Sequence, residues 1–485
     1  MAIDRERAPF VAARRFGLGA GPGEIERLRA DPRGAVLAQV DAKAALLTAP
    51  GLVPAAEALR RTWAHMEEAK RMAENPPPPP SPPRTASPDG AAMAEAARPM
   101  APPPPGAPDP APAKARPVFQ EIFEAEFAAR LDRQISTTTP LAERMVNFWS
   151  NHFCVAAGKS AGVRASTGAY EREAVRPHVF GRFRDMLRAS ARHPAMLAYL
   201  DNFISIGPRS KTGTVSGKGL NENLGREILE LHTLGVDGGY TQADVTAFST
   251  ALTGWGIANL QTRGAEPGTF FFAPANHEPG TVRILGRDYP QTGPDQAAAA
   301  LDDFARHPAT ARHVARKLVR HFVGDRAPAG LADRLATVFR DTDGDLAAVT
   351  RALIGADDAW NAPPAKILSP WEILVTTGRV LGIDWSFPAA NRMLNLFGQP
   401  LWDVPFPQGW PDDDEAWAAP ASLLELLDAM SALAARNAGD RSVTRLAGEV
   451  LGPQLHPSTR RAIERAETRS AALALLLMSP DFLRR

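Results

Sequence analysis

The segment NENLGREILELHTLGVDGGYTQADVTAFSTALTGW, residues 221–255, places acids, an arginine and a histidine within a pattern typical of a packed helix. A carboxylate held in apolar surroundings can acquire a raised pKa and act as a general acid or base. An arginine beside it could orient or neutralise an anionic group of a substrate. Glu227 and Arg226 are therefore candidates for a reaction centre. A purely structural network of paired polar groups is the alternative.

A helix of 3.6 residues per turn decides which of these side chains could meet. Residues 221–234 then have one apolar face: Leu224, Ile228 and Leu231. Glu227 and His232 flank that face on opposite sides and diverge too far to hold one metal ion together. The other face carries an i, i+4 ladder of alternating charge: Glu222, Arg226 and Glu230. We predict that Arg226 and Glu227 join His152 in one buried polar cluster.

The end of the same segment adds two candidates. Thr241 with Asp244 three residues later resembles a capping box, so a helix cap is the favoured interpretation of Asp244 and a catalytic acid the alternative. Trp255 closes the segment and is expected near the predicted cleft.

His152 lies in LAERMVNFWSNHF, where the apolar residues recur at helical spacing. A face of Leu141, Met145, Phe148 and Trp149 includes it, so a buried neutral histidine with one partner is the simplest interpretation. A ligand-binding histidine or a general base in a pocket is the alternative.

Two further segments could contact a ligand. In FGQPLWDVPFPQGWPDDDEAW, Trp402, Phe406 and Trp410 could form a wall on which a sugar stacks, or a loop packed by its own aromatic rings. HVARKLVRHF has a basic face, which on a nearly neutral protein favours a solvated surface: Arg316, Lys317 and Arg320.

Composition excludes several classes of function. The 485-residue chain has a formal net charge of +1, so no global field attracts nucleic acid. Its one cysteine, Cys154, excludes an internal disulfide and a CxxC zinc site. We predict no metal site, identify no cofactor and find no apolar run long enough for a membrane span. The N-terminus lacks a signal-peptide core, so a cytoplasmic location is expected, or a periplasmic one if the start is mis-assigned.

Apolar spacing along most of the chain predicts a mainly α fold. We expect an N-terminal helical unit (1–74), a disordered insertion rich in Pro and Ala (75–118) and a main helical domain (119–485). Residues 270–272 and 282–285 are predicted to pair as a short β-hairpin.

Several motifs occur in a fixed order: NFWSNHFCV, the long segment above, NHEPGTVRILG, ARKLVRHFVGD, LGIDWSF with FGQPLWDVPFPQGWPDD, and LALLLMSPDFLRR. Together they resemble the bacterial domain-of-unknown-function 1800 family over nearly the whole chain except the proline-rich insertion. The resemblance implies export in many members and a neighbouring-gene partner with a sulfatase-like appearance. It supplies no catalytic residues.

Two hypotheses of function follow. The first is a hydrolase or lyase that acts on a polymer, with saccharides as the first class to test. Its predicted catalytic residues are Glu227, His152, His232 and Asp244, and its predicted substrate-binding residues are Arg226, Trp255, Trp402 and Trp410. The second is a binding or assembly factor that works with the neighbouring-gene partner and whose polar cluster is structural.

Overall fold

The computed structural model describes residues 3–75, 116–418 and 420–485. Helix accounts for 61% of the described residues and strand for 4%, which confirms the predicted mainly α fold. The predicted insertion at 75–118 lies almost entirely outside the described residues.

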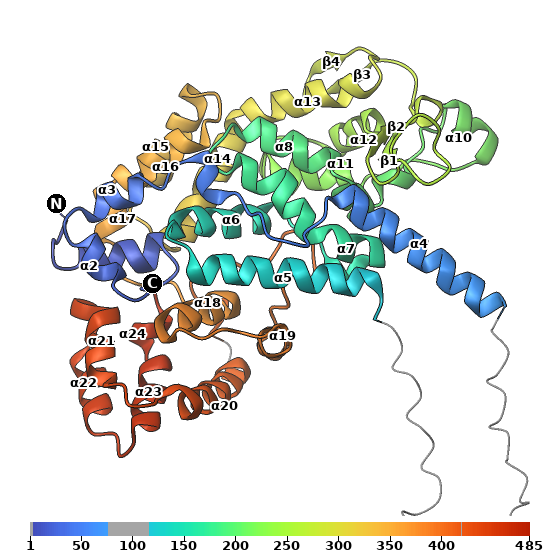
Figure 1. Cartoon of the computed structure of the whole chain (residues 1–485). Helices are drawn as coiled ribbons and strands as arrows, with labels where there is room; N and C mark the ends of the chain where they lie inside the picture. Colours follow the sequence, from blue (N-terminus) through green and yellow to red (C-terminus); the bar gives the residue numbers. More distant parts are fainter. Residues whose placement is uncertain (1–2, 76–115, 419) are drawn as a thin grey trace, which may run out of the picture.

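The N-terminal region consists of short helices followed by one long helix (Figure 1). These are α1 (Ala8–Val11), η1 (Ala12–Phe16), α2 (Glu24–Leu28), α3 (Pro32–Leu37), η2 (Ala42–Ala45) and α4 (Ala55–Glu74).

The central region begins with the long helix α5, which crosses the middle of the molecule (Figure 1). Its helices before the strands are α5 (Val118–Ser136), α6 (Pro140–His152), η3 (Ala157–Lys159), α7 (Ala161–Tyr170), η4 (Glu171–Val175), η5 (Arg176–His178), α8 (Phe183–Arg192), α9 (Pro194–Tyr199), η6 (Asn202–Ile204), α10 (Lys211–Ser216), α11 (Asn223–Glu227), η7 (Ile228–His232) and α12 (Gln242–Ala251). After the strands come α13 (Pro294–Arg306), α14 (Pro308–Phe322), α15 (Leu331–Asp341), α16 (Leu346–Gly355) and α17 (Asp357–Asn361).

The C-terminal helices α20 to α24 group together at one end of the molecule (Figure 1). This region contains α18 (Pro370–Leu381), α19 (Phe387–Leu396), α20 (Pro420–Asn437), α21 (Val443–Leu451), η9 (Gly452–Gln454), α22 (Pro457–Glu464), α23 (Arg469–Leu477) and α24 (Pro480–Leu483). Proline follows a capping residue at several helix starts, as in the capping box of α18 formed by Ser369 and Glu372.

The predicted pairing of residues 270–272 with 282–285 is wrong, because the structure has two separate hairpins. β2 (Phe270–Phe272) pairs antiparallel with β1 (Trp255–Ile257), and β3 (Val282–Ile284) pairs with β4 (Arg287–Tyr289). Between β3 and β4, Leu285 and Gly286 both have positive φ, the conformation of a tight two-residue hairpin turn. Because of that turn, β3 pairs with β4, the strand that follows it directly in the chain. The short helix η8 (Pro274–Asn276) separates β2 from β3.

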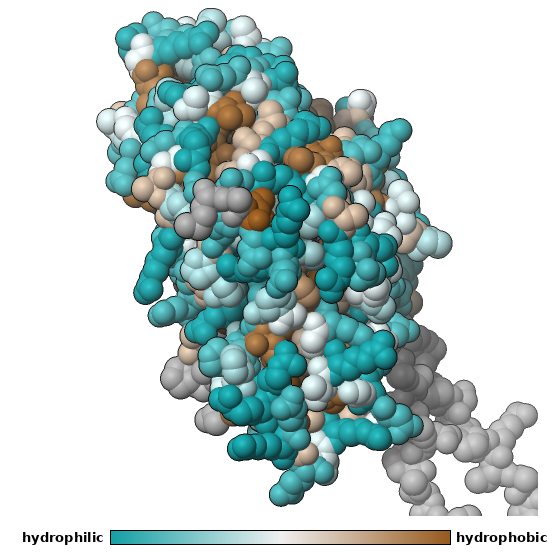
Figure 2. All heavy atoms as spheres, turned by 90° about the vertical axis from the view of Figure 1, so that its left-hand side faces the viewer, coloured by the Kyte–Doolittle hydropathy of each residue, from teal (hydrophilic) through white to brown (hydrophobic). Residues whose placement is uncertain are grey.

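Two hydrophobic clusters form the core. The larger joins residues from 8–45, within the predicted N-terminal unit, to residues from 141–362. The second joins α5 to the helices from α18 onward. One face of the surface is mostly hydrophilic with small, separate apolar patches (Figure 2). Among the described helices, none is long and apolar enough to cross a membrane.

Candidate functional site

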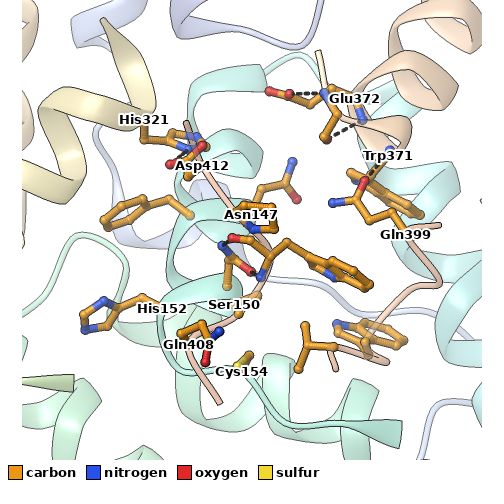
Figure 3. A pocket seen from close by; sticks show the side chains of 18 of the residues that line it. Asn147, Ser150, His152, Cys154, His321, Trp371, Glu372, Gln399, Gln408 and Asp412 are labelled. Carbon is orange, nitrogen blue, oxygen red and sulfur yellow. Dashed lines mark hydrogen bonds and ion pairs between the residues drawn. The ribbon is translucent and has the colours of Figure 1, made fainter. Parts of the chain in front are cut away.

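A cavity of about 600 Å³ lies where the two hydrophobic clusters meet. Its walls come from α5, α6, α14, the start of α18 and the loop between α19 and α20. Figure 3 shows His321 and Asp412 on one side of it and Trp371 with Gln399 on the other. A junction between two packed units is a common place for a ligand pocket.

Aromatic rings and amides line much of this cavity. Its tryptophans are Trp371, Trp402, Trp410 and Trp417, and its side-chain amides are Asn147, Asn151, Gln399 and Gln408. The guanidinium of Arg130 lies 4.6 Å from the Trp371 ring centre and 5.4 Å from that of Trp402. Flat apolar faces beside amides suit a ligand that has both ring faces and hydroxyl groups.

The loop that closes the cavity is held in place by α6. Asn151 Nδ2 donates to the Trp410 carbonyl at 2.9 Å, and its Oδ1 accepts from the Trp410 amide at 2.7 Å. Gly409 has φ +81°, and a Cβ there would lie 2.5 Å from the Asn151 carbonyl oxygen, so only glycine fits. The loop between α19 and α20 is therefore a fixed wall of the cavity.

Beneath this wall, Glu171 joins the loop to a buried ion-pair network. Its carboxylate contacts Arg130 Nε at 3.0 Å and accepts from Arg176 Nε at 2.9 Å. It also accepts from Ser150 Oγ at 2.9 Å and Trp402 Nε1 at 3.1 Å. Burial alone would raise the pKa of Glu171, but the two arginines outweigh burial and hold that pKa below its usual value.

His321 and Asp412 form a dyad in the cavity wall. His321 Nδ1 lies 3.0 Å from Asp412 Oδ2, and Lys366 Nζ lies 2.7 Å from Asp412 Oδ1. Burial lowers the pKa of His321 to about 4, although Asp412 opposes the shift, so the imidazole is neutral near pH 7. Because the carboxylate only accepts, Nδ1 carries the proton and Nε2 is a free acceptor. Nε2 is buried and has no hydrogen-bond partner among the described residues.

The hydroxyl and thiol groups in and just after α6 already donate hydrogen bonds to other residues. Ser150 donates to Glu171, and the Cys154 thiol donates to the Pro407 carbonyl at 3.0 Å. Burial raises the pKa of Cys154 to about 12, so its thiolate is scarce at neutral pH. Neither group is prepared to act as a nucleophile.

Of the residues predicted from the sequence, His152, Trp402 and Trp410 line the cavity. His152 Nε2 donates to the His232 backbone carbonyl at 3.0 Å, and its Nδ1 is buried without a partner in the described part of the chain. Burial is the main reason that the pKa of His152 lies well below its usual value. His152 is thus a buried neutral histidine at the cavity edge, as its apolar face predicts.

The predicted buried cluster of Arg226, Glu227 and His152 is not present. The Arg226 side chain is 39% exposed and pairs with Glu222 at 3.0 Å, while Glu227 is only half-buried. The helix changes to π geometry over Ile228–His232, so the 3.6-residue placement fails after Glu227. Neither Arg226 nor Glu227 is among the residues that line the cavity.

His232, Asp244 and Trp255 also lie outside the cavity lining. His232 is buried, and burial lowers its pKa to about 3. Asp244 forms the predicted capping box with Thr241 at the start of α12 and accepts from the Leu285 amide. Trp255 packs against Phe270, with ring centres 5.3 Å apart.

Glu227 is a half-buried carboxylate that forms no hydrogen bond or ion pair with any described residue. Burial raises its pKa, and the neighbouring Glu230 raises it further. A carboxylate whose pKa is raised in the folded protein destabilises the fold when it ionises. The free energy of unfolding therefore falls as the pH rises from the pKa of the unfolded state to that of the folded state. We predict that Glu227→Gln leaves the melting temperature unchanged or raises it at pH 7, and has less effect near pH 4.

Glu222→Gln is the matched control in thermal melts at both pH values. Hydrogen bonds from Thr246 and Gln242, together with Arg226, hold the pKa of Glu222 low, so its substitution should lower the melting temperature at pH 7. A clear drop for Glu227→Gln would show that the carboxylate has a stabilising partner.

Sequence reasoning missed His321, Asp412 and Lys366, and assigned Lys317 to a solvated face. Lys317 and Arg320 in fact line the cavity. A signal was present: HVARKLVRHF and WPDDDEAW place basic and acidic residues beside aromatic ones. Their sequence separation hid the pairing, since Asp412 follows His321 by 91 residues.

In the parts of the chain that the structure covers, no group of three or more His, Cys, Asp or Glu residues could hold a metal ion. No curated protein matches the chain, and no solved structure matches it. A family model does match residues 11–484, from the last residue of α1 to the residue before the C-terminal one. The chain therefore belongs to the family described as protein of unknown function DUF1800.

Proposed function

We propose that this protein is a hydrolase that binds a saccharide-like polymer in the cavity and uses His321 as its general base. The observation that carries the proposal is the free Nε2 of His321, oriented by Asp412, in a cavity walled by tryptophans and amides. The catalytic residues predicted from the sequence are replaced here by the His321–Asp412 dyad.

The half-buried Trp410 supplies a flat surface on which a sugar ring can stack, because the C–H face of a sugar is apolar. Trp371 and Trp402 are more deeply buried, with Arg130 over their rings, and form the floor of the cavity. The amides of Asn147 and Gln399 can donate to and accept from hydroxyl groups. The proposal retains the substrate-binding role predicted from the sequence for Trp410, with Trp402 lining the cavity beside it.

In the reaction, a water molecule enters from the cavity to reach the buried Nε2 of His321 and gives it a proton as the water oxygen attacks the carbon of the scissile bond. The imidazolium that forms is stabilised by Asp412, which accepts from Nδ1. On the opposite side of the scissile bond the leaving oxygen takes a proton from a second water molecule as the bond breaks. His321 then returns its own proton to the hydroxide left by that second water, which restores its neutral form. Lys366 keeps Asp412 ionised through this cycle by pairing with its other oxygen.

A binding role without catalysis is the second candidate. Phe406 in the same loop is 59% exposed, an uncommon placement for a large apolar ring. Under this alternative Phe406 would contact a partner protein, such as the sulfatase-like product of a neighbouring gene, and the cavity would only hold a ligand.

The test combines binding with turnover. Neutral and acidic oligosaccharides are titrated while tryptophan fluorescence is recorded, and the release of new reducing ends from matching polysaccharides is measured. We expect quenching together with turnover. Quenching without turnover would support the binding role, and a cavity that responds to no saccharide would overturn the hydrolase.

A further inference from the structure

Lys317 is the cation of the cavity that lacks a counter-charge. It lies in α14 and lines the cavity, yet it makes no hydrogen bond or ion pair within the described residues. The other lysines and arginines of the lining are paired: Arg130 with Glu171, Lys366 with Asp412, and Arg320 with Asp325.

The groups around Lys317 cannot neutralise it. Asp412, the carboxylate whose charge raises the pKa of Lys317, is already paired with His321 and Lys366. Burial raises the pKa of the Cys154 thiol to about 12, so that group is neutral as well.

The histidines that interact with Lys317 do not supply a negative charge either. Burial, reinforced by Lys317, lowers the pKa of His313 to about 4 and that of His232 to about 3. Burial likewise keeps His152 neutral. An ammonium in such surroundings has lost much of its hydration without gaining a partner, which is a costly arrangement that an anion would relieve.

Lys317 is also well placed with respect to the proposed base. His321 follows it by four residues in the regular helix α14, so the two side chains lie on the same face, one turn apart. The Cβ atoms of residues at this spacing are about 5–6 Å apart, so an anion at Lys317 would lie on the same side of α14 as His321.

We propose that Lys317 binds an anionic group of the substrate, a carboxylate or a sulfate ester carried by the sugar unit next to His321. The proposal rests on the proposed function in one respect, that the cavity holds the substrate. It adds that the substrate is an acidic saccharide and that one turn of α14 sets the distance between its charge and the reacting bond.

The experiment compares glucose, glucuronic acid and glucose 6-sulfate as probes of the full-length protein, by calorimetric titration at constant ionic strength. We expect at least one acidic sugar to bind about tenfold more tightly than glucose, equivalent to about 1.4 kcal/mol. The acid that shows this gain identifies the substrate group as a carboxylate or a sulfate.

Lys317→Met should abolish the preference, and Lys317→Gln provides a second, polar replacement if the first fails to fold. Arg316→Met is the matched control, because Arg316 is exposed, adjacent in α14 and outside the cavity lining. We expect this control to keep the preference. Equal affinity for the three sugars in the wild-type protein, or a preference that survives both Lys317 substitutions, would overturn the proposal.

These outcomes are separable from those of the proposed function. Turnover of neutral saccharides without any acidic preference would leave His321 as the base and remove Lys317 from substrate recognition. Acidic sugars that bind through Lys317 but are not cleaved would keep the anion site and remove the hydrolase.

Discussion

His321→Ala is expected to lower kcat/KM by about 100- to 10,000-fold on any polysaccharide that the wild-type protein cleaves, the range for losing a positioned general base. The imidazole has a free acceptor nitrogen in the cavity wall, and Asp412 fixes its tautomer. Binding of the saccharide should change much less, because the tryptophans that stack the sugar are untouched. Steady-state kinetics measures kcat/KM, and a fluorescence titration measures saccharide binding.

The pH profile gives a second readout of the same group. A base must be unprotonated, and burial holds the pKa of His321 at about 4, so kcat/KM should fall as pH drops through that value. Asp412→Asn removes the carboxylate that raises this pKa, and the acid limb should move to lower pH along with a loss of rate. A limb that stays in place would show that another group titrates.

His307→Asn is the matched control for His321→Ala. His307 caps the start of the same helix α14, where its Nδ1 accepts from the Ala309 amide, and asparagine can replace this cap. It lies outside the cavity lining, so activity should not change. Full activity in His321→Ala would remove the residue from the mechanism.

Glu171→Gln is expected to lower the free energy of unfolding by about 3–5 kcal/mol, the usual cost of breaking a buried ion pair from one side. The substitution keeps the shape of the side chain but removes the carboxylate partner of Arg130 and leaves Arg176 paired with Glu143 alone. Denaturant unfolding at pH 7 measures the loss. Fluorescence should change too, because Glu171 accepts from the Trp402 indole.

The loss should shrink at acid pH. A carboxylate whose folded pKa is depressed stabilises the protein above its unfolded pKa, and this contribution disappears as pH falls through the folded value. Glu449→Gln is the control, because Glu449 pairs with Arg445 on the exposed surface of α21. That pair is expected to contribute about 0.3–0.5 kcal/mol. Equal effects of the two substitutions would contradict the buried network.

Local patterns in the sequence were sufficient for the helical class and for some individual roles. The spacing of Leu141, Met145, Phe148 and Trp149 correctly places His152 on a buried face, since periodicity depends only on neighbours within a few turns. The capping box of Thr241 and Asp244 was equally predictable, because its two partners are three residues apart.

The partners of charged residues were decided only by the tertiary structure. Helical spacing shows which side of α14 is apolar, but not that Asp412, from a loop 91 residues later, would contact His321. Nor does it show that no acid among the described residues would pair with Lys317. The π turn at Ile228–His232 likewise depends on packing and shifts the side chains after Glu227 away from their predicted faces. The cavity forms where segments distant in sequence meet, and local periodicity carries no information about such contacts.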